Sequence, residues 1–267
     1  MTTAVARPAG RRRDWAVVAG REVGDLWLSG RGPAMMVAFS VLLSVVAWLV
    51  ATNQALNYLE QRESVGLVLQ VAVAVGALMV LLAAANAISG ERERGTLESL
   101  LVTPVSRPGL VAGKLLAALS LWAAAAIVAL PYVWFLGRDV GAVAAAVGVG
   151  ALVGTLVAVC LASLGGIVSV VSASNRWSLM IGLFVLLALY APTQLPTGAR
   201  SGWAGELLQR VNPLAAGGHV LNRVVVAGRP LSDEWSWLAS PLICAAVGVT
   251  ALTLLASRMS LRGGRTP

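Results

Sequence analysis

Six long apolar runs constrain the fold of this 267-residue chain more than any other feature. Each is close to the roughly 20 residues that a helix needs to cross a hydrocarbon core about 30 Å thick. We therefore predict an all-α, polytopic membrane protein with six transmembrane helices, at about 33–52, 65–89, 110–136, 140–171, 178–195 and 237–257. The run 140–171 exceeds one crossing, so it must tilt, break at Gly165 and Gly166, or extend into water.

The amount and placement of charge agree with a membrane protein. Hydrophobic residues make up 58% of the chain and charged residues only 12%, which excludes an ordinary water-soluble enzyme. The formal net charge of +8 is distributed unevenly among the loops. Most basic residues fall on one predicted side, namely Arg7, Arg11, Arg12, Arg13, Arg21, Arg31, Arg92, Arg94, Arg107, Lys114, Arg176, Arg258, Arg262 and Arg265. Because positive loops stay in the cytoplasm, both termini are predicted to be cytoplasmic.

The 32 residues before the first span carry a further helical pattern. Apolar side chains recur at helical spacing from Trp15 to Leu26, although Glu22 interrupts the stripe. Charged residues between the arginine triplet 11–13 and the first span exclude a cleaved signal peptide. We predict a cytoplasmic segment 1–32 with a helix in the membrane interface rather than a solvated arm, then one six-span domain, 33–257, and a cytoplasmic tail, 258–267.

The connection 88–114, ISGERERGTLESLLVTPVSRPGLVAGK, is the most informative stretch. Its helical wheel separates a charged face from an apolar ridge, and Pro104 would end the helix. The charged face holds Glu91, Arg94 and Glu98, and the ridge holds Leu97, Leu100 and Leu101. An apolar ridge at the cytoplasmic surface has to be covered, either by the N-terminal helix of the chain or by a partner.

This stretch resembles the signature of the permease subunits of type-2 ABC exporters. In that family an acidic segment containing Gly-Thr-Leu-Glu forms a coupling helix, which docks on a separate nucleotide-binding ATPase subunit. The matching motif continues through 104–107 to Gly113 and Lys114. The resemblance implies that the ATPase contacts Glu91, Glu93, Gly95, Thr96, Leu97, Glu98, Leu100 and Leu101.

A second stretch, NPLAAGGHVLNRVVVAG at 212–228, is similar to the Asn-Pro element of the same family. That element lies in external re-entrant helices before the last span, and the matching residues are Asn212, Pro213 and Arg223. The resemblance implies a permease that pairs with a second permease subunit, as a homodimer, and with cytoplasmic ATPase subunits. The expected surroundings are the lipid bilayer, with no nucleic-acid partner.

The sequence predicts no chemistry of its own: no catalytic residues, no cofactor and no metal. The nearest approach to a phosphate-binding loop, PGLVAGKLL, has Gly109 one residue too close to the Gly-Lys pair and Leu115 in place of the hydroxyl residue. The single histidine, His219, has no partner evident in the sequence and is interpreted as structural. Ionisable groups are nearly absent from the spans, where Lys114 could snorkel to the surface, so an ion-coupled carrier is disfavoured.

Small residues inside the spans carry two further expectations. Cys160 and Cys244 have the spacing of neither a metal site nor a disulfide framework, so we expect two separate buried side chains. Gly150 and Gly154 have the G-x-x-x-G spacing, which permits a close helix approach, and packing within the chain is the favoured interpretation over contact with another chain.

Together these features predict the transmembrane permease subunit of an ATP-driven ABC exporter. Closure of the ATPase dimer would push on the element 91–101 and move a substrate outward. The alternative is a non-transporting membrane scaffold that recruits a cytoplasmic partner through the same loop. Arginine supplies all but one of the 20 basic residues, which is typical of GC-rich bacterial genomes, so the expected location is a bacterial plasma membrane.

Overall fold

The chain is a bundle of long helices, seen in a computed structural model that describes residues 14–52, 58–96, 106–194 and 202–257. The long elements are α1 (Asp14–Leu28), α2 (Arg31–Thr52), α3 (Tyr58–Glu93), α5 (Arg107–Gly137), α6 (Val143–Val171), α7 (Asn175–Tyr190) and α12 (Ala239–Ser257). The short elements are η1 (Ala191–Gln194), α9 (Trp203–Val211), α10 (Pro213–Leu221), η2 (Asn222–Val226), α11 (Leu231–Glu234) and η3 (Trp235–Leu238). The described residues contain no strand.

Within the described residues, six helical segments are long and apolar enough to cross a membrane. They run over Arg31–Thr52, Gln61–Glu93, Arg107–Gly137, Val143–Val171, Asn175–Gln194 and Leu231–Ser257. Each contains or largely overlaps one predicted span, so the prediction of an all-α, polytopic membrane protein is confirmed. The separate helix α1 precedes them, where the amphipathic pattern predicted a helix.

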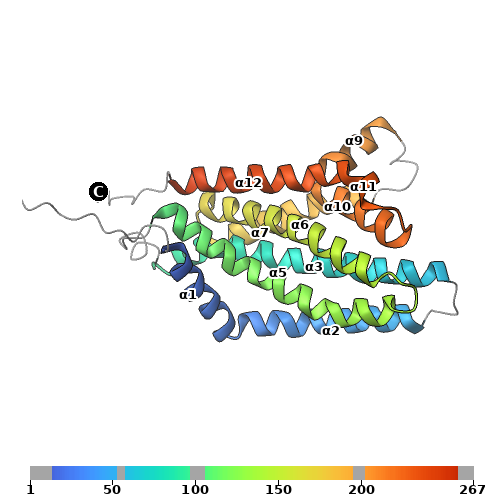
Figure 1. Ribbon diagram of the computed structural model, residues 1–267. Helices are drawn as coiled ribbons and strands as arrows, with labels where there is room; N and C mark the ends of the chain where they lie inside the picture. Colours follow the sequence, from blue (N-terminus) through green and yellow to red (C-terminus); the bar gives the residue numbers. More distant parts are fainter. Residues whose placement is uncertain (1–13, 53–57, 97–105, 195–201, 258–267) are drawn as a thin grey trace, which may run out of the picture.

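Helix α3 forms the middle of the bundle, packing against α2, α5, α6 and α7, while α12 packs on α6. The start of α1 and the end of α12 lie at one end of the bundle, which we call the terminus end (Figure 1). The short helices α9, α10 and α11 lie at the opposite end, which we call the distal end (Figure 1). The first and last described helices therefore meet at one end of the bundle, as six crossings require.

The long fourth apolar run forms one unbroken helix, α6, which excludes a break at the glycine pair. Gly165 and Gly166 instead allow close packing on two sides of α6. A Cβ added at Gly165 would lie 2.6 Å from the carbonyl oxygen of Leu81 on α3, and one at Gly166 would lie 2.7 Å from a methyl group of Leu252 on α12. A larger residue at Gly165 would displace the backbone of α3, whereas one at Gly166 would first displace the side chain of Leu252.

The G-x-x-x-G pair on α6 packs within the chain, as the favoured interpretation expected. A Cβ at Gly150 would lie 2.7 Å from the side chain of Leu69, and one at Gly154 would overlap the indole of Trp122. The same indole donates a hydrogen bond through Nε1 to Thr155 Oγ1 at 3.1 Å. The small residues on α6 thus accommodate large side chains from α3 and α5.

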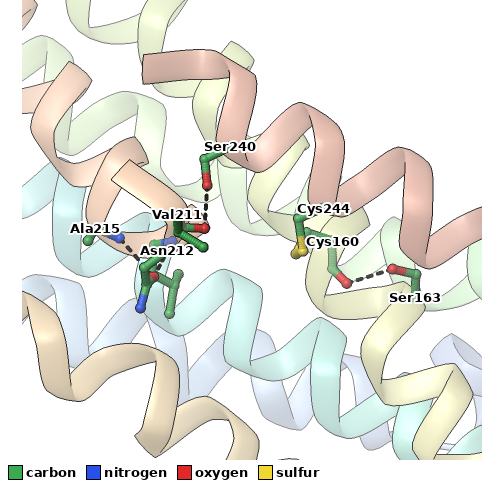
Figure 2. The surroundings of a disulfide bond; sticks show 8 residues. Cys160, Ser163, Val211, Asn212, Ala215, Ser240 and Cys244 are labelled. Carbon is green, nitrogen blue, oxygen red and sulfur yellow. Dashed lines mark hydrogen bonds between the residues drawn. A yellow bond between two sulfur atoms is a disulfide. The ribbon is translucent and has the colours of Figure 1, made fainter. Parts of the chain in front are cut away.

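A disulfide bond between Cys160 and Cys244 joins α6 to α12, so the expectation of two separate cysteines is wrong (Figure 2). Their Cα atoms are 5.5 Å apart although 84 residues separate them in the chain. This separation lies in the ordinary range for bridged cysteines. Sequence spacing could not reveal the pair because the bond depends on the packing of α12 against α6.

Candidate functional site

The acidic motif divides where α3 ends at the terminus end of the bundle. Gly95 has a left-handed φ of +71°, its N–H bonds to the carbonyl of Arg92 at 3.2 Å, and the N–H of Thr96 bonds to the carbonyl of Glu91 at 3.0 Å. These two bonds form a Schellman motif, which ends a helix. The expectation of a single helix from Glu91 to Leu101 is therefore wrong, because Glu91 and Glu93 belong to the last turn of the third helix.

Lys114 is buried within a cluster of two carboxylates from other helices. Its Nζ lies 2.5 Å from Glu91 Oε1 and 2.8 Å from Glu22 Oε1, and only 3% of the lysine side chain is exposed. The expectation that Lys114 snorkels to the surface is therefore wrong, because two carboxylates satisfy its charge inside the protein. We call Glu22, Lys114 and Glu91 the ionic cluster; it connects α1, α5 and the end of α3.

Helix α1 lies along the first half of α5, and the residue before Lys114 makes this possible. A Cβ at Gly113 would lie 2.6 Å from the side chain of Val18 and 3.0 Å from the backbone nitrogen of Ala19. A hydrogen bond from Trp27 Nε1 on α1 to Ser120 Oγ on α5, at 3.1 Å, also connects the two helices. The Gly-Lys pair of the motif thus has two distinct roles: the glycine admits α1 and the lysine binds it.

The last turn of α3 is also fixed to the opposite side of the bundle. The guanidinium of Arg92 donates hydrogen bonds to the carbonyls of Ser172 and, at 3.1 Å, Val170, at the C-terminal end of α6. The Ser89 hydroxyl donates to Asn175 Oδ1, at the start of α7, at 3.1 Å. Polar contacts therefore connect the last turn of α3 to α1, α5, α6 and α7, directly beneath the turn that follows it.

The predicted contact residues fall into three groups in the structure. Glu91 faces inward, with 13% of its side chain exposed. Glu93, Gly95 and Thr96 are exposed at the turn. The remaining predicted residues, Leu97, Glu98, Leu100 and Leu101, lie outside the described residues.

A cavity of about 1380 Å³ opens beside the ionic cluster, between α1, α2, α3, α5 and α7. Glu22, Lys114 and Glu91 all line it. Its deeper wall is apolar and includes Leu78 and Leu82 on α3. Charged side chains thus meet an apolar interior at the terminus end of the bundle.

At the distal end, the Asn-Pro element begins the helix α10. Asn212 is the N-cap: its Oδ1 accepts bonds from the backbone N–H groups of Leu214, at 2.9 Å, and Ala215, at 3.1 Å (Figure 2). Its Nδ2 donates to the carbonyl of Leu189 near the end of α7 at 2.7 Å. Pro213 occupies the first helical position, where its missing N–H leaves no donor unpaired.

Helix α10 folds back into the bundle, which agrees with a re-entrant element. A Cβ at Gly217 would lie 2.9 Å from Val153 and 3.4 Å from Val157. Val153 is ten residues from the start of α6 at Val143, which corresponds to a depth of about 15 Å. Arg223, the third predicted residue of the element, lies exposed in the π-helical segment η2.

His219 has partners that the sequence did not indicate. Its Nε2 lies 3.2 Å from Glu234 Oε2, and its ring stacks on Trp237 at a centroid distance of 3.9 Å. Burial lowers the pKa of His219 from its usual value of 6.5; Glu234 acts in the opposite direction, and Arg223 and Arg210 add to the lowering. No group of three or more metal-ligating side chains was found among the described residues.

Comparison with known proteins identifies the family. The model of the ABC-2 family transporter proteins matches residues 16–215, which is most of the chain. The chain belongs to the ABC-2 transporter family. No curated protein matches it.

This assignment confirms the resemblance found in the sequence and identifies the chain as a multi-pass membrane protein with a permease role. ABC-2 permeases are membrane transport components that work with an ATPase subunit. The match covers most of α1, the ionic cluster, the acidic turn and the Asn-Pro cap. Sequence reasoning missed one member of the ionic cluster, Glu22, whose signal was the charge that interrupted the apolar stripe of α1.

Proposed function

We propose that this ABC-2 protein is the permease subunit of an ATP-driven exporter and that its acidic turn receives the force from a separate ATPase subunit. The observation that carries the proposal is the ionic cluster directly behind that turn. Lys114 contacts both Glu22 and Glu91 at 2.8 Å or less, so a displacement of the turn would move three helices together. A flexible loop without such contacts would move by itself and leave the helices in place.

The ATPase would contact the exposed part of the motif. Glu93, Gly95 and Thr96 present a carboxylate and polar groups to solvent, while Glu91 is engaged inside the chain. We propose that Leu97, Glu98, Leu100 and Leu101 complete the contact surface. Asn212, Pro213 and Arg223 would belong to the external closure of the pathway rather than to the ATPase interface.

The wider assembly follows from orientation and exposure. We propose a bacterial plasma membrane location with both termini in the cytoplasm, a cytoplasmic segment 1–32, a single permease domain 33–257 and a tail 258–267. A second copy would pack on α2 and α7, because these spans are the least buried of the six, at 17% and 11%. Hydrolysis of ATP would take place in the partner, and this chain would have no catalytic role, cofactor or metal.

The decisive experiment is co-purification with the candidate ATPase after charge reversal at the exposed acidic position. We expect Glu93→Lys to reduce recovery of the ATPase about tenfold, because it replaces an attractive interfacial charge by a repulsive one. Glu206→Lys is the matched control, since Glu206 is 60% exposed on α9 at the distal end. Equal recovery with both variants would contradict the coupling role.

Transport distinguishes the permease from a membrane scaffold. In liposomes containing the complex, a permease should move cargo in an ATP-dependent manner, and Glu93→Lys should abolish that movement. A scaffold would bind the ATPase but show neither transport nor cargo-stimulated hydrolysis. That outcome would overturn the proposed function while leaving the contact surface intact.

A further inference from the structure

The short helix α9 at the distal end carries an apolar face that the described residues leave exposed. Trp203, Leu207 and Val211 recur at every fourth residue and are 82%, 55% and 66% exposed. Leu208 lies beside them and is 46% exposed. Side chains four residues apart lie on one face of a helix, so these four residues form a continuous stripe along the whole of α9. We call them the α9 stripe.

The rest of α9 divides into a buried side and a charged side. Gly205 is buried and Gln209 is half-buried, so this side faces the elements that α9 contacts, α10 and η1. Glu206 and Arg210 form an exposed ion pair at 3.3 Å. At about 100° per residue, the ion pair falls between the buried side and the α9 stripe. A helix on a water-exposed surface needs only a buried side and a polar side, whereas three distinct sides suit a helix that meets protein, water and lipid.

Two hydrogen bonds hold the end of α9 at the level of the membrane spans. Ser240 Oγ donates to the carbonyl of Val211 at 2.7 Å (Figure 2). Ser240 belongs to the first turn of α12, within the sixth span, and Leu242, two residues later, has its apolar side chain exposed. The next residue of the α9–α10 connection, Asn212, binds the carbonyl of Leu189 within the fifth span. The α9 stripe therefore ends beside span residues whose exposed apolar side chains face lipid.

The position and composition of α9 favour lipid over water as its surroundings. Figure 1 shows α9 projecting away from the bundle at the distal end, beside the start of α12. A contiguous apolar stripe is costly in water and marks a surface that meets a partner or a membrane. Trp203 is of the residue type enriched where acyl chains meet headgroups. Arg210 places a positive charge on the polar side, as is typical of helices that lie in a membrane surface.

We propose that α9 lies in the lipid interface at the distal end of the bundle, with the α9 stripe among the acyl chains and the Glu206–Arg210 pair in the headgroup layer. The partner of this surface is the phospholipid leaflet itself. Because a single residue separates α9 from α10, the leaflet anchors the start of the Asn-Pro element. A movement of that element would have to shift α9 along the membrane plane. The placement requires neither an ATPase nor a cargo, so it can fail or succeed separately from the proposed function.

The test is the accessibility of nitroxide spin labels on the full chain in nanodiscs of phosphatidylcholine and phosphatidylglycerol. Leu207→Cys carries the label on the α9 stripe, and Glu206→Cys, the adjacent residue of similar exposure, is the matched control. The native cysteines are joined in a disulfide, so the thiol-specific label reacts with the introduced cysteine. Collisions are measured with molecular oxygen, which concentrates in lipid, and with nickel(II) ethylenediaminediacetate, which stays in water. We expect the oxygen-to-nickel collision ratio to be about fivefold higher at Leu207 than at Glu206.

A second position on the stripe makes the test independent of one variant's folding. Val211→Cys should give a collision ratio close to that of Leu207→Cys. Equal ratios on the α9 stripe and at Glu206, with frequent nickel collisions at both, would show a helix in water and overturn the proposal. Rare collisions with both reagents on the stripe would show that protein covers it and would overturn the proposal equally. Spin–spin broadening that disappears on dilution with unlabelled protein would then identify a second copy as the cover.

Discussion

Removal of the positive charge of Lys114 should destabilise the protein much more than the loss of an exposed ion pair. In Lys114→Met the aliphatic stem remains, but Glu22 and Glu91 lose their shared partner. The two carboxylate oxygens both contact Nζ, at 2.8 and 2.5 Å, so they lie no more than about 5 Å apart. At an effective dielectric constant of about 20, two like charges at that separation repel by about 3 kcal/mol.

The exposure of Glu22 and Glu91 determines how much free energy Lys114→Met should cost in total. Glu91 is 13% exposed and Glu22 is 21% exposed, so water relieves only part of the cost. Breaking a buried ion pair by removing one partner costs about 3–5 kcal/mol, and the partial exposure favours the lower end, about 3 kcal/mol. For a protein of this size that corresponds to a fall in Tm of about 6–12 °C.

The assay is thermal unfolding of the purified protein in detergent, followed by tryptophan fluorescence. Arg21→Met is the matched control, because its ion pair with Asp25 is also on α1 but both side chains are more than 70% exposed. That pair is worth at most about 0.5 kcal/mol, so we expect a change of no more than about 2 °C. Adding Glu22→Gln and Glu91→Gln to Lys114→Met should recover much of the loss. Equal Tm values for Lys114→Met and Arg21→Met would refute a buried ionic connection.

Three further outcomes follow from packing, titration and covalent structure. Gly154→Ala should lower the Tm, because overpacking against the indole on α5 costs about 1–3 kcal/mol of stability, whereas Gly148→Ala, with nothing within 4 Å, should not. Equal Tm values for the two variants would contradict the packing. Because burial lowers the pKa of His219 below 6.5, the unfolded chain binds more protons at this residue than the folded chain. The stability of the wild type should therefore fall relative to that of His219→Gln as the pH drops from 7 to 5. A pH-independent difference in Tm between the two proteins would argue against this. Maleimide added to denatured, unreduced protein should leave Cys160 and Cys244 unlabelled, and prior reduction should add two labels by intact mass; labelling without reduction would rule out the bond.

Local features of the sequence predicted the helices because their signals lie within short stretches of chain. Apolar runs long enough to cross a membrane became the six spans. Ser106 caps α5 by accepting from the N–H of Gly109 at 3.3 Å, with a proline in the first turn. The Asn-Pro pair likewise begins α10. Gly95 was part of the recognised motif, but its role as a helix end was missed because a charged face with members on both sides of it, Glu91, Arg94 and Glu98, suggested one continuous helix.

The family resemblance predicted where the site lies in the chain, whereas packing decided which residues form it. Lys114 and Glu22 are 92 residues apart, and neither the apolar run of α5 nor the stripe of α1 indicates that they meet. The same holds for Glu234, whose carboxylate lies against the only histidine. These contacts depend on the rotation of each helix about its axis and on which helices are neighbours.

The physical reason is the solvent that surrounds a membrane protein. In water an amphipathic pattern marks the buried face of a helix, but lipid is as apolar as the protein interior, so spans such as α3 and α12 carry apolar residues all round. The sequence by itself therefore determined the number, length and order of the crossings. Only the tertiary structure decided the helix neighbours, and with them the ionic cluster, the disulfide bond and the cavity.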